Sequence, residues 1–334
     1  MKNQIFYLLG AGASVMQNKQ TKKACLPLAN DFVDKLYKLR YEIKKNDNNI
    51  YTTNTGQIIN GIALKDVSIN ELINSFLDIL STADTIDEAM RYFYLNENKR
   101  HFIHFKKMIS IIFYVFENIE QFRDPRYKQF LMTLLEGKDF KLPNNVKILS
   151  WNYDNQFEHA CYEIQDKKKK IKKILNEENF LKINGSASFQ KVISKIGGDL
   201  TPIRENFNKF TKMQNQIDFA WEEEFLSKFN SRVNKVRDFK NEKVKRTLVA
   251  IGYSFPYINH KYDFQIINTI MPSKIYIQNP FIENEEAFKN SFLERFALKT
   301  FQPEIEIIKD CSRFHIPNEM YEGFDSKSLF EIFS

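Results

Sequence analysis

Residues 5–14 constrain this chain most, because an apolar run of strand length stops there in a turn of small residues, Gly-Ala-Gly-Ala-Ser. Gly10 and Gly12 lie in that turn, although the chain of 334 residues contains only ten glycines. A strand that ends in such a turn is a common nucleotide site in α/β proteins, since backbone N–H groups there can face phosphate. The third glycine of the dinucleotide pattern G-x-G-x-x-G is missing, so the turn alone does not establish nucleotide binding.

Further runs in the sequence have the length and apolar character of buried strands. They are residues 146–150, 180–183, 247–251, 274–278 and 304–308. Several end in glycine or a polar residue and precede a helical pattern, such as the one at 155–163. This alternation predicts an α/β fold with a Rossmann-like parallel sheet flanked by helices.

Two long segments between the predicted strands are polar and helical in pattern. Residues 31–137 contain capping boxes at Ser68-x-x-Glu71 and Thr85-x-x-Glu88, and residues 190–246 form a second such segment. No internal repeat is evident. We therefore expect a single domain, residues 1–334, with large helical insertions at 31–137 and 190–246 that fold over the ligand edge as a lid or lobe.

Cysteine usage and hydropathy restrict the class of protein. Cys25, Cys161 and Cys311 lie far apart without a C-x-x-C pair, which argues against a disulfide framework and against a cysteine-rich zinc site. No later apolar run reaches the ~20 residues that a membrane span requires. Lys2 and the apolar run after it resemble a short signal peptide, but the strand interpretation gives the same residues a role that the later motifs need. We expect a cytoplasmic protein.

The net charge of +7 leaves the class of partner open. Residues 167–173 contain six lysines in seven positions, on what the pattern indicates is a loop after a helix. Such a run either contacts nucleic acid or is a solvated loop.

Small and amide-bearing residues follow the predicted strands at their carboxyl ends. Because the carboxyl ends of parallel strands lie along one rim, we expect these residues to converge with the first turn on one ligand pocket. They are Asn152, Asp154, Asn184, Ser186, Ser254 and Asn279. Asp154 also has a simpler interpretation, as the cap of the helix that follows it.

The order of these motifs along the chain resembles the sirtuin-like family of NAD-binding proteins, in its bacterial anti-phage defence branch. The motifs are G-A-G-x-S, N-x-D, a strand ending in x-G-S, G-x-S, and a strand ending in Asn. The resemblance covers only the strand ends. It implies a Rossmann-like fold that binds NAD and cleaves the bond between nicotinamide and ribose.

The resemblance also implies a role for each strand end. Asn152 and Asp154 would face the nicotinamide ribose and carboxamide, with Asn184 as the third catalytic position. The NAD-binding residues would be Gly10, Ala11, Gly12 and Ser14 at the pyrophosphate, Gly185 and Ser186 after the third strand, Gly252 and Ser254 at the phosphates and ribose, and Asn279 at the adenosine ribose. The deacetylases of the family carry a four-cysteine zinc ribbon that this chain lacks, so we expect no zinc and no acyl-lysine chemistry.

One position departs from the family pattern. Asn184 stands where the family has a histidine before Gly-Ser, and an amide cannot accept a proton near neutral pH. Loss of general-base help typically lowers a rate by ~10²–10⁴. His260 is the first candidate for a substitute base, although a surface or helix-capping role also fits it, whereas His159 is better explained by a structural role.

Three functions therefore remain open at this stage; one is a nucleic-acid-contacting subunit, which rests only on the lysine run and the net charge, and the other two concern NAD. The first is an enzyme that hydrolyses NAD to nicotinamide and ADP-ribose, linear or cyclic, as an anti-phage effector. The second is a catalytically silent sensor of NAD or ADP-ribose. Because such an effector must be quiet in healthy cells, we expect control by a homo-oligomer or a defence-system partner protein.

Overall fold

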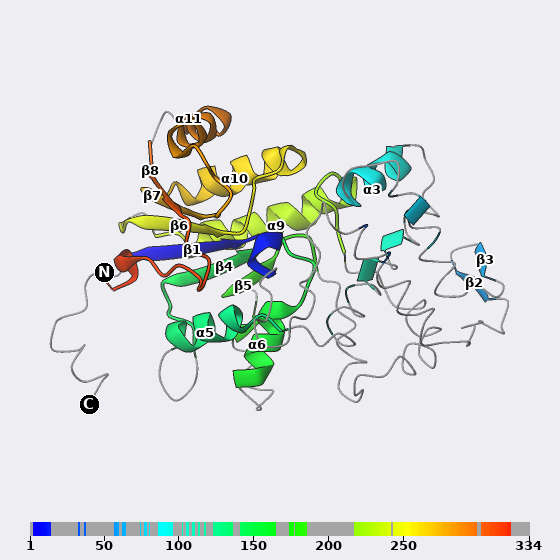
Figure 1. Ribbon diagram of the computed structural model, residues 1–334, viewed down its shortest axis with the longest axis horizontal. Helices are drawn as coiled ribbons and strands as arrows, with labels where there is room; N and C mark the ends of the chain where they lie inside the picture. The colour runs from blue at the N-terminus through cyan, green and yellow to red at the C-terminus, as the bar shows by residue number, and fades with distance from the viewer. Residues whose placement is uncertain are drawn as a thin grey trace.

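The computed structural model has a six-stranded parallel sheet with helices on both faces (Figure 1). It describes residues 3–14, 86–95, 123–135, 141–164, 174–176, 178–185, 217–241, 243–298 and 302–321, and, between 33 and 117, residues 33, 37, 57–59, 62–64, 74, 77, 78, 80, 102, 105, 106, 109, 110, 113 and 117. The strands are β1 (Gln4–Leu9), β4 (Val146–Ser150), β5 (Phe180–Lys182), β6 (Arg246–Ile251), β7 (Lys274–Gln278) and β8 (Glu304–Ile308). The predicted α/β, Rossmann-like class is confirmed.

The strand order places β1 in the middle of the sheet. The order is β5-β4-β1-β6-β7-β8, and every neighbouring pair is parallel. When these six strands are numbered in chain order, the sheet has the order 3-2-1-4-5-6 of dinucleotide-binding folds. The first three strands extend the sheet to one side of β1 and the last three extend it to the other side. Ligands of such sheets bind at the switch point between the two sides, outside the carboxyl ends of the strands. Here the switch point lies between β1 and β6.

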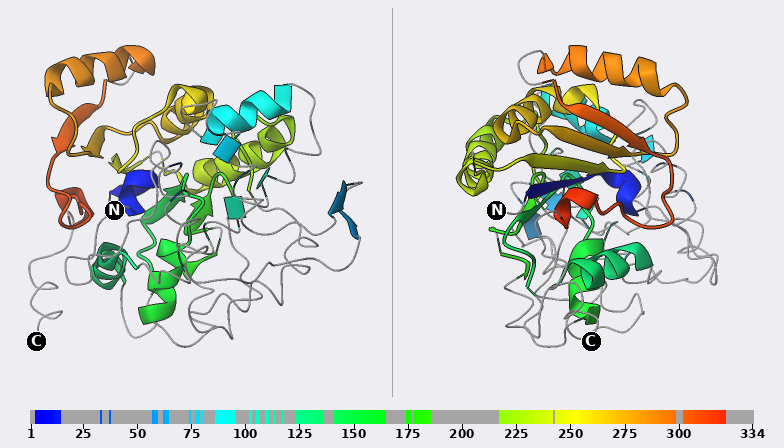
Figure 2. Two further views of the ribbon diagram at one scale, coloured as in Figure 1. Left: turned by 45° about the vertical axis from the view of Figure 1, so that its right-hand side comes forward. Right: turned by 90° about the vertical axis from the view of Figure 1, so that its left-hand side faces the viewer.

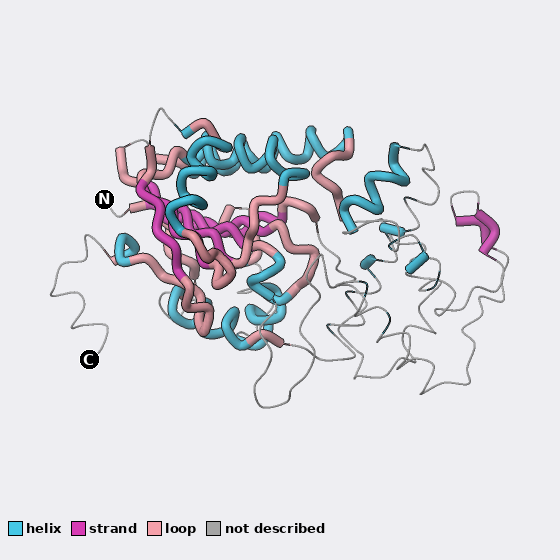
Figure 3. The backbone as a smooth tube through the Cα atoms, turned by 45° about the horizontal axis from the view of Figure 1, so that its top comes forward, coloured by secondary structure: helices cyan, strands magenta, loops and turns pink. Residues whose placement is uncertain are grey.

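Helices cover the sheet in two layers that Figures 1 and 2 show above and below the strands. One layer contains α9 (Glu223–Phe239), α10 (His260–Ile270) and α11 (Glu285–Arg295); the other contains α5 (Pro125–Leu134) and α6 (Gln156–Ile164). The described chain also has α3 (Ile86–Leu95) and the short helices η1 (Ala11–Ser14), η3 (Tyr257–Asn259) and η5 (Asn318–Met320). In the tube view, helices lie on both sides of the sheet strands (Figure 3).

Alternate side chains of β1 explain why this strand is buried along its whole length. Phe6 and Leu8 belong to the core on the side of α9 and α10. Tyr7 and Leu9 belong to the core on the side of α5 and α6. Since a strand presents successive side chains to opposite faces, an unbroken apolar run marks a strand covered on both sides.

The described parts of the two predicted insertions include helices that cover the sheet. From residues 190–246, α9 contributes Phe225, Phe229 and Val233 to the core on its face. From residues 31–137, α5 contributes Tyr127 and Phe130 to the core on the opposite face. The segment 31–137 also contains an antiparallel pair, β2 (Gln57–Ile59) with β3 (Ile62–Leu64).

Some sequence predictions lie outside the described residues. These are Ser186, Cys25, the lysine run 167–173, and Ser68, Glu71 and Thr85 of the two predicted capping boxes. Among the described residues, no helix combines the length and the apolar character that crossing a bilayer demands.

Candidate functional site

The turn after β1 and the loop after β6 touch at the switch point of the sheet. The backbone N–H of Gly10 donates to the carbonyl of Ile251 at 3.0 Å, and that of Gly12 donates to the carbonyl of Gly252 at 2.8 Å. A β-carbon on Gly10 would stand 2.6 Å from the carbonyl oxygen of Gly252. The glycines at 10, 12 and 252 thus let two protein loops approach each other.

This contact bears on the predicted phosphate turn. The family resemblance implies that Gly10 and Gly12 hold pyrophosphate, but in the structure their backbone N–H groups donate to protein carbonyls. Ala11 of the same turn is exposed and Gly12 is partly exposed, whereas Ser14 is buried. Of the four residues predicted to hold pyrophosphate, Ala11 is the one that presents most of its surface to solvent.

Ser14 and Asn152 meet as predicted, in a buried polar cluster under the turn. The Nδ2 group of Asn152 donates to Ser14 Oγ at 3.3 Å and to the Tyr127 hydroxyl at 3.4 Å. Ser14 Oγ and the Tyr127 hydroxyl are 2.8 Å apart. The amide oxygen of Asn152 is buried and has no hydrogen-bond partner among the described residues. A buried acceptor without a partner is costly, so this oxygen is a candidate for binding a ligand.

Asp154 serves as a helix cap and also joins this cluster. Its Oδ1 accepts the backbone N–H of Gln156 at 3.0 Å, at the start of α6. The Ser14 hydroxyl lies near the carboxyl group and favours its ionised form, which lowers its pKa. Burial, and after it the neighbouring carboxylate of Glu117, raise the pKa of Asp154 to about 7, while Lys182 opposes the shift. The helix-cap interpretation of Asp154 is therefore confirmed, and its role at a ligand stays a prediction.

Buried charges surround Asp154 on the side away from Ser14. Glu117 accepts from the Asn155 side chain at 3.0 Å and lies 3.5 Å from Nε2 of His159. Burial opposes ionisation of Glu117, but the nearby His159 and the hydrogen bonds from Asn155 outweigh it and lower the pKa of Glu117. Lys182 pairs with Glu158 at 3.0 Å and donates to the carbonyl of Asp154.

Asn184 lies at the end of β5 and contacts the neighbouring strand end. Its Nδ2 donates to the carbonyl of Trp151 at 3.2 Å, and its buried Oδ1 has no partner among the described residues. Gly185, which follows, has φ +74° and bridges to Ile217. The structure thus places a second unpaired amide oxygen at the carboxyl edge, on the side chain whose Nδ2 holds the carbonyl just after β4.

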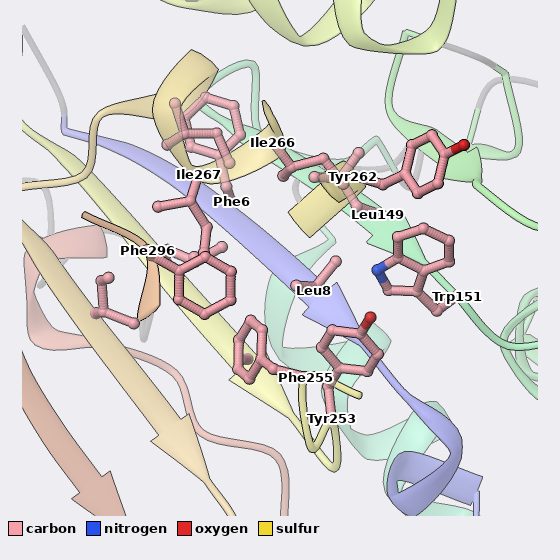
Figure 4. Close-up of a cluster of buried hydrophobic side chains, with 14 of the residues drawn as sticks. Phe6, Leu8, Leu149, Trp151, Tyr253, Phe255, Tyr262, Ile266, Ile267 and Phe296 are labelled. Carbon is pink, nitrogen blue, oxygen red and sulfur yellow. The ribbon is translucent and has the colours of Figure 1, made fainter. Parts of the chain in front are cut away.

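Ser254 is exposed and stands in the chain between Tyr253 and Phe255, whose buried rings are drawn in Figure 4. Phe255 adopts φ +53° and packs its ring against Phe292 at 5.0 Å. Tyr253 stacks on Trp151, with ring centroids 6.0 Å apart and planes at 12°. A positive φ in a bulky residue is strained and persists only where the surroundings fix it, so the loop is rigidly shaped around Ser254.

A buried carboxylate lies behind this loop. Asp263 of α10 accepts from Trp151 Nε1 at 3.1 Å and from the Tyr253 hydroxyl at 3.0 Å. Burial raises the pKa of Asp263 well above its usual value. Asp263 therefore links the ends of β4 and β6 to α10.

The remaining candidates are placed away from these contacts. Asn279 is partly exposed and its Oδ1 accepts the backbone N–H of Phe281 at 3.0 Å, which forms the turn after β7. His260 begins α10, and its Nδ1 accepts from Arg295 at 3.4 Å. His159 pairs with Glu117. Among the described residues, neither histidine forms a hydrogen bond or ion pair with Asn152 or Asn184, and a replacement base stays a prediction.

Sequence reasoning missed Tyr127, Glu117 and Asp263. Each is a buried polar group that contacts a predicted strand end, yet each comes from a helical position without a recognisable motif. The one visible signal was Asp124-Pro125 at the start of α5, where Asp124 caps the helix and brings Tyr127 one turn later against Ser14.

The fold and the site together define a parallel α/β protein with Rossmann strand order and a buried polar cluster at its strand ends. Within the described residues, no group of three or more His, Cys, Asp or Glu side chains is arranged to hold a metal ion. Comparison with protein-family models finds no match, and comparison with curated proteins finds none either.

Proposed function

We propose that this protein binds NAD at the carboxyl edge of its sheet and hydrolyses the bond between nicotinamide and ribose. The observation that carries the proposal is the unpaired amide oxygen of Asn152, buried beside Ser14 at the ends of the central strands. An acceptor in that position suits a ribose hydroxyl or a carboxamide N–H. The strand order supports the same conclusion, because it is the order of dinucleotide-binding sheets.

The chemistry of the reaction fits the charge of the site. When the glycosidic bond breaks, its electron pair leaves with nicotinamide and positive charge develops on the ribose. The amide oxygen of Asn152 and the ionised carboxylate of Asp154 would both stabilise that charge, since fixed dipoles and charges act strongly where water is excluded. Water then adds to the ribose carbon and releases a proton. The exposed Ala11 and Ser254 are the predicted binding residues most open to the phosphates.

Product analysis with a matched control tests the proposal. Purified protein incubated with NAD should release equal amounts of nicotinamide and ADP-ribose. Asn152→Ala should lower the rate by ~10²-fold or more, the usual cost of removing a group that stabilises a transition-state charge. Asn234→Ala removes an exposed asparagine on α9 and should leave the rate unchanged. Failure to form product under any condition, with Asn152→Ala binding NAD as the parent does, would reject the proposal.

Asn184 favours a second candidate, a protein that binds NAD or ADP-ribose without turnover. Its amide holds the carbonyl of Trp151 and has no acidic proton to exchange near neutral pH. Calorimetry separates the two candidates, because the sensor binds tightly and forms no product. In that case Asn184→His, which restores a base, should introduce hydrolysis.

The anti-phage role is a separate part of the proposal and needs its own experiment. Bacteria that carry the parent gene should lose NAD and resist plaque formation after phage infection, whereas bacteria with Asn152→Ala should do neither. Light scattering of the purified protein, alone and with NAD, would show whether control involves a homo-oligomer.

A further inference from the structure

Arg295, the last residue of α11, has a guanidinium group that the described residues leave mostly without partners. Its Nε–H donates to Nδ1 of His260 at 3.4 Å. Its Nη2 is buried and has no hydrogen-bond partner among the described residues. The charge of Arg295 is felt by Asp263, but the oxygens of Asp263 accept from Trp151 and Tyr253. Cationic groups that are withdrawn from water are normally paired, so the free N–H groups of Arg295 point to a bound anion.

Aromatic rings hold this guanidinium in place. Its central carbon lies over the ring of Tyr257, 4.1 Å from the centroid, and 5.3 Å from the ring centroid of Phe296. Such rings attract a cation but supply no oxygen to accept its N–H groups. Tyr257 is 82% exposed and Arg295 is partly exposed, so an anion has access to the guanidinium from solvent.

His260 provides a second donor beside Arg295. Because its Nδ1 accepts the N–H of Arg295, its ring proton is on Nε2. The ring packs against Phe296 with centroids 5.4 Å apart. His260 is also the first residue of α10, and the residue before it, Asn259, forms no side-chain cap. The start of a helix favours negative charge, so α10 and α11 both direct donors to the same place.

These groups lie on the loop after β6, at the carboxyl edge of the sheet. Tyr257 and His260 follow the exposed Ser254 in that loop. The ring of Phe296, next to Arg295 in the chain, packs against Phe255 with centroids 5.7 Å apart, and Figure 4 labels both rings. The turn after β1 reaches the same edge, but its glycine amides donate to protein carbonyls. A dinucleotide bound there therefore needs another partner for its phosphates.

We infer that Arg295 and His260 bind the pyrophosphate of the dinucleotide, with Arg295 as its cationic partner. That the pyrophosphate is the one of NAD rests on the proposed function, whereas the anion site rests on the unpartnered guanidinium. Phosphate suits this site because the N–H groups of a guanidinium match two oxygens of one phosphate. Each phosphate of a dinucleotide is negatively charged, and a charged donor binds it more strongly than a backbone amide does.

Nuclear magnetic resonance with inorganic phosphate tests the anion site without NAD. The Nε–H signal of Arg295, assigned by its loss in Arg295→Gln, should shift when phosphate is added but not when chloride is added at equal ionic strength. Arg237 is the matched control, since it is exposed and donates to Asn234 on its own helix. Equal responses of the two arginine signals to phosphate would overturn the anion site.

Calorimetry with NAD and ADP-ribose tests whether the phosphates belong to the dinucleotide. Arg295→Gln should weaken the binding of both ligands by ~10–100-fold, the usual contribution of a hydrogen bond to a charged group, and Arg237→Gln should not. Inorganic phosphate should compete with NAD for the parent protein. Unchanged NAD affinity in Arg295→Gln, or phosphate that binds without competing, would show that the site takes a different phosphorylated ligand and would overturn the inference.

His260→Phe keeps the experiment decisive if Arg295→Gln does not fold. Phenylalanine retains the contact with the ring of Phe296 and lacks the Nε2–H donor, so NAD should bind several-fold more weakly at unchanged thermal stability. If this variant binds NAD as tightly as the parent, His260 is not part of the site.

Kinetics distinguish this inference from the proposed activity. Arg295→Gln should raise KM for NAD and leave kcat within about twofold, as expected for a group that binds substrate and transition state equally. A parent that hydrolyses NAD with the same KM as Arg295→Gln contradicts the inference alone. A parent that shows the phosphate response of Arg295 but never hydrolyses NAD rejects the proposed activity and leaves the anion site in place.

Discussion

Gly252 and Gly12 lie so close that a β-carbon on Gly252 would stand 2.2 Å from the carbonyl carbon of Gly12. Gly252 also has φ +58°, a conformation that side chains with a β-carbon rarely adopt. Two independent constraints therefore require glycine at this position. The contact fixes the loop after β6 to the turn after β1, and so shapes the edge at which we propose NAD binds.

Gly252→Ala should lower the free energy of unfolding by about 3 kcal/mol or more. The left-handed backbone costs ~1–2 kcal/mol and the clash with rigid backbone adds a similar amount. Urea denaturation followed by circular dichroism measures the change. Ser254→Ala, an exposed substitution two residues later, should change stability by less than ~0.5 kcal/mol. Equal stability of the two variants would show that the loops can separate freely.

The sheet could be predicted from the sequence because each strand is an apolar run of strand length with a clear stop. The predicted runs 146–150, 274–278 and 304–308 match β4, β7 and β8 residue for residue. The central strands are buried on both faces and show no polar alternation, so length and stop signals carry their prediction, whereas the edge strand β8 alternates glutamate with isoleucine. The pairing of β1 with both β4 and β6 could not be read from the chain, because it depends on packing between distant segments.

The site was predicted in part. Ser14 and Asn152 were expected to meet, since both follow central parallel strands, and their contact spans 138 positions. Tyr127 was not expected, because a tyrosine on a helix has many uses and its position depends on how α5 packs. The use of the Gly12 amide was also not foreseen, since the sequence cannot distinguish a glycine that admits a ligand from one that admits another loop.

The buried ion pair at the start of α5 should be essential for stability. Asp124 and Arg126 are 2.6 Å apart with almost no exposed side-chain surface, and Arg126 also donates to the carbonyl of Ala13 at 3.1 Å. Arg126→Met removes the cation and leaves the Asp124 carboxylate buried without its partner. Breaking a buried pair in this way typically costs ~3–5 kcal/mol. We expect a loss in that range in chemical denaturation.

The control for this prediction is the double variant Asp124→Asn, Arg126→Met. The double variant removes the unpaired carboxylate charge at position 124, while the asparagine still caps α5. Part of the lost free energy of unfolding should therefore be recovered. If the double variant is no more stable than Arg126→Met, the uncompensated charge is not the cause of the loss.

Acidic groups buried in the native protein should make its stability fall as pH rises towards neutral. The pKa of Asp154 is raised from 3.8 to about 7, so between these values the folded chain holds a proton that the unfolded chain has released. Stability from this group is complete below pH ~4 and is lost as pH rises to about 7, by up to ~4 kcal/mol at 1.36 kcal/mol per unit. Asp87, with a pKa raised to about 6 by burial, acts in the same direction.

Thermal or urea unfolding of the parent and of Asp154→Asn at several pH values measures this effect. The asparagine cannot ionise, so the stability of the variant relative to the parent should increase steadily between pH 4 and 7 and then level off. A difference that is constant over this range would mean that Asp154 is already ionised in acid.

Asp263 should tolerate asparagine but not leucine. Burial raises the pKa of Asp263 well above its usual value, and asparagine keeps an oxygen that can accept from Trp151 Nε1–H without a charge to bury. Leucine would leave Trp151 Nε1–H without its acceptor and remove one partner of the Tyr253 hydroxyl. We expect Asp263→Leu to cost about 3 kcal/mol, since each buried polar group that loses its partner costs ~1–3 kcal/mol, and Asp263→Asn to cost less than half of that.

Fluorescence reports on this pair because the chain contains only two tryptophans, Trp151 and Trp221. With Trp221→Phe as background, the emission of Trp151 should change in Asp263→Leu, since the indole N–H loses a carboxyl partner, and should stay close to the parent in Asp263→Asn. Because Trp151 precedes Asn152 and its carbonyl is held by Asn184, the leucine variant should also weaken NAD binding. Unchanged emission and stability in Asp263→Leu would mean that the ends of β4 and β6 are held by ring stacking alone.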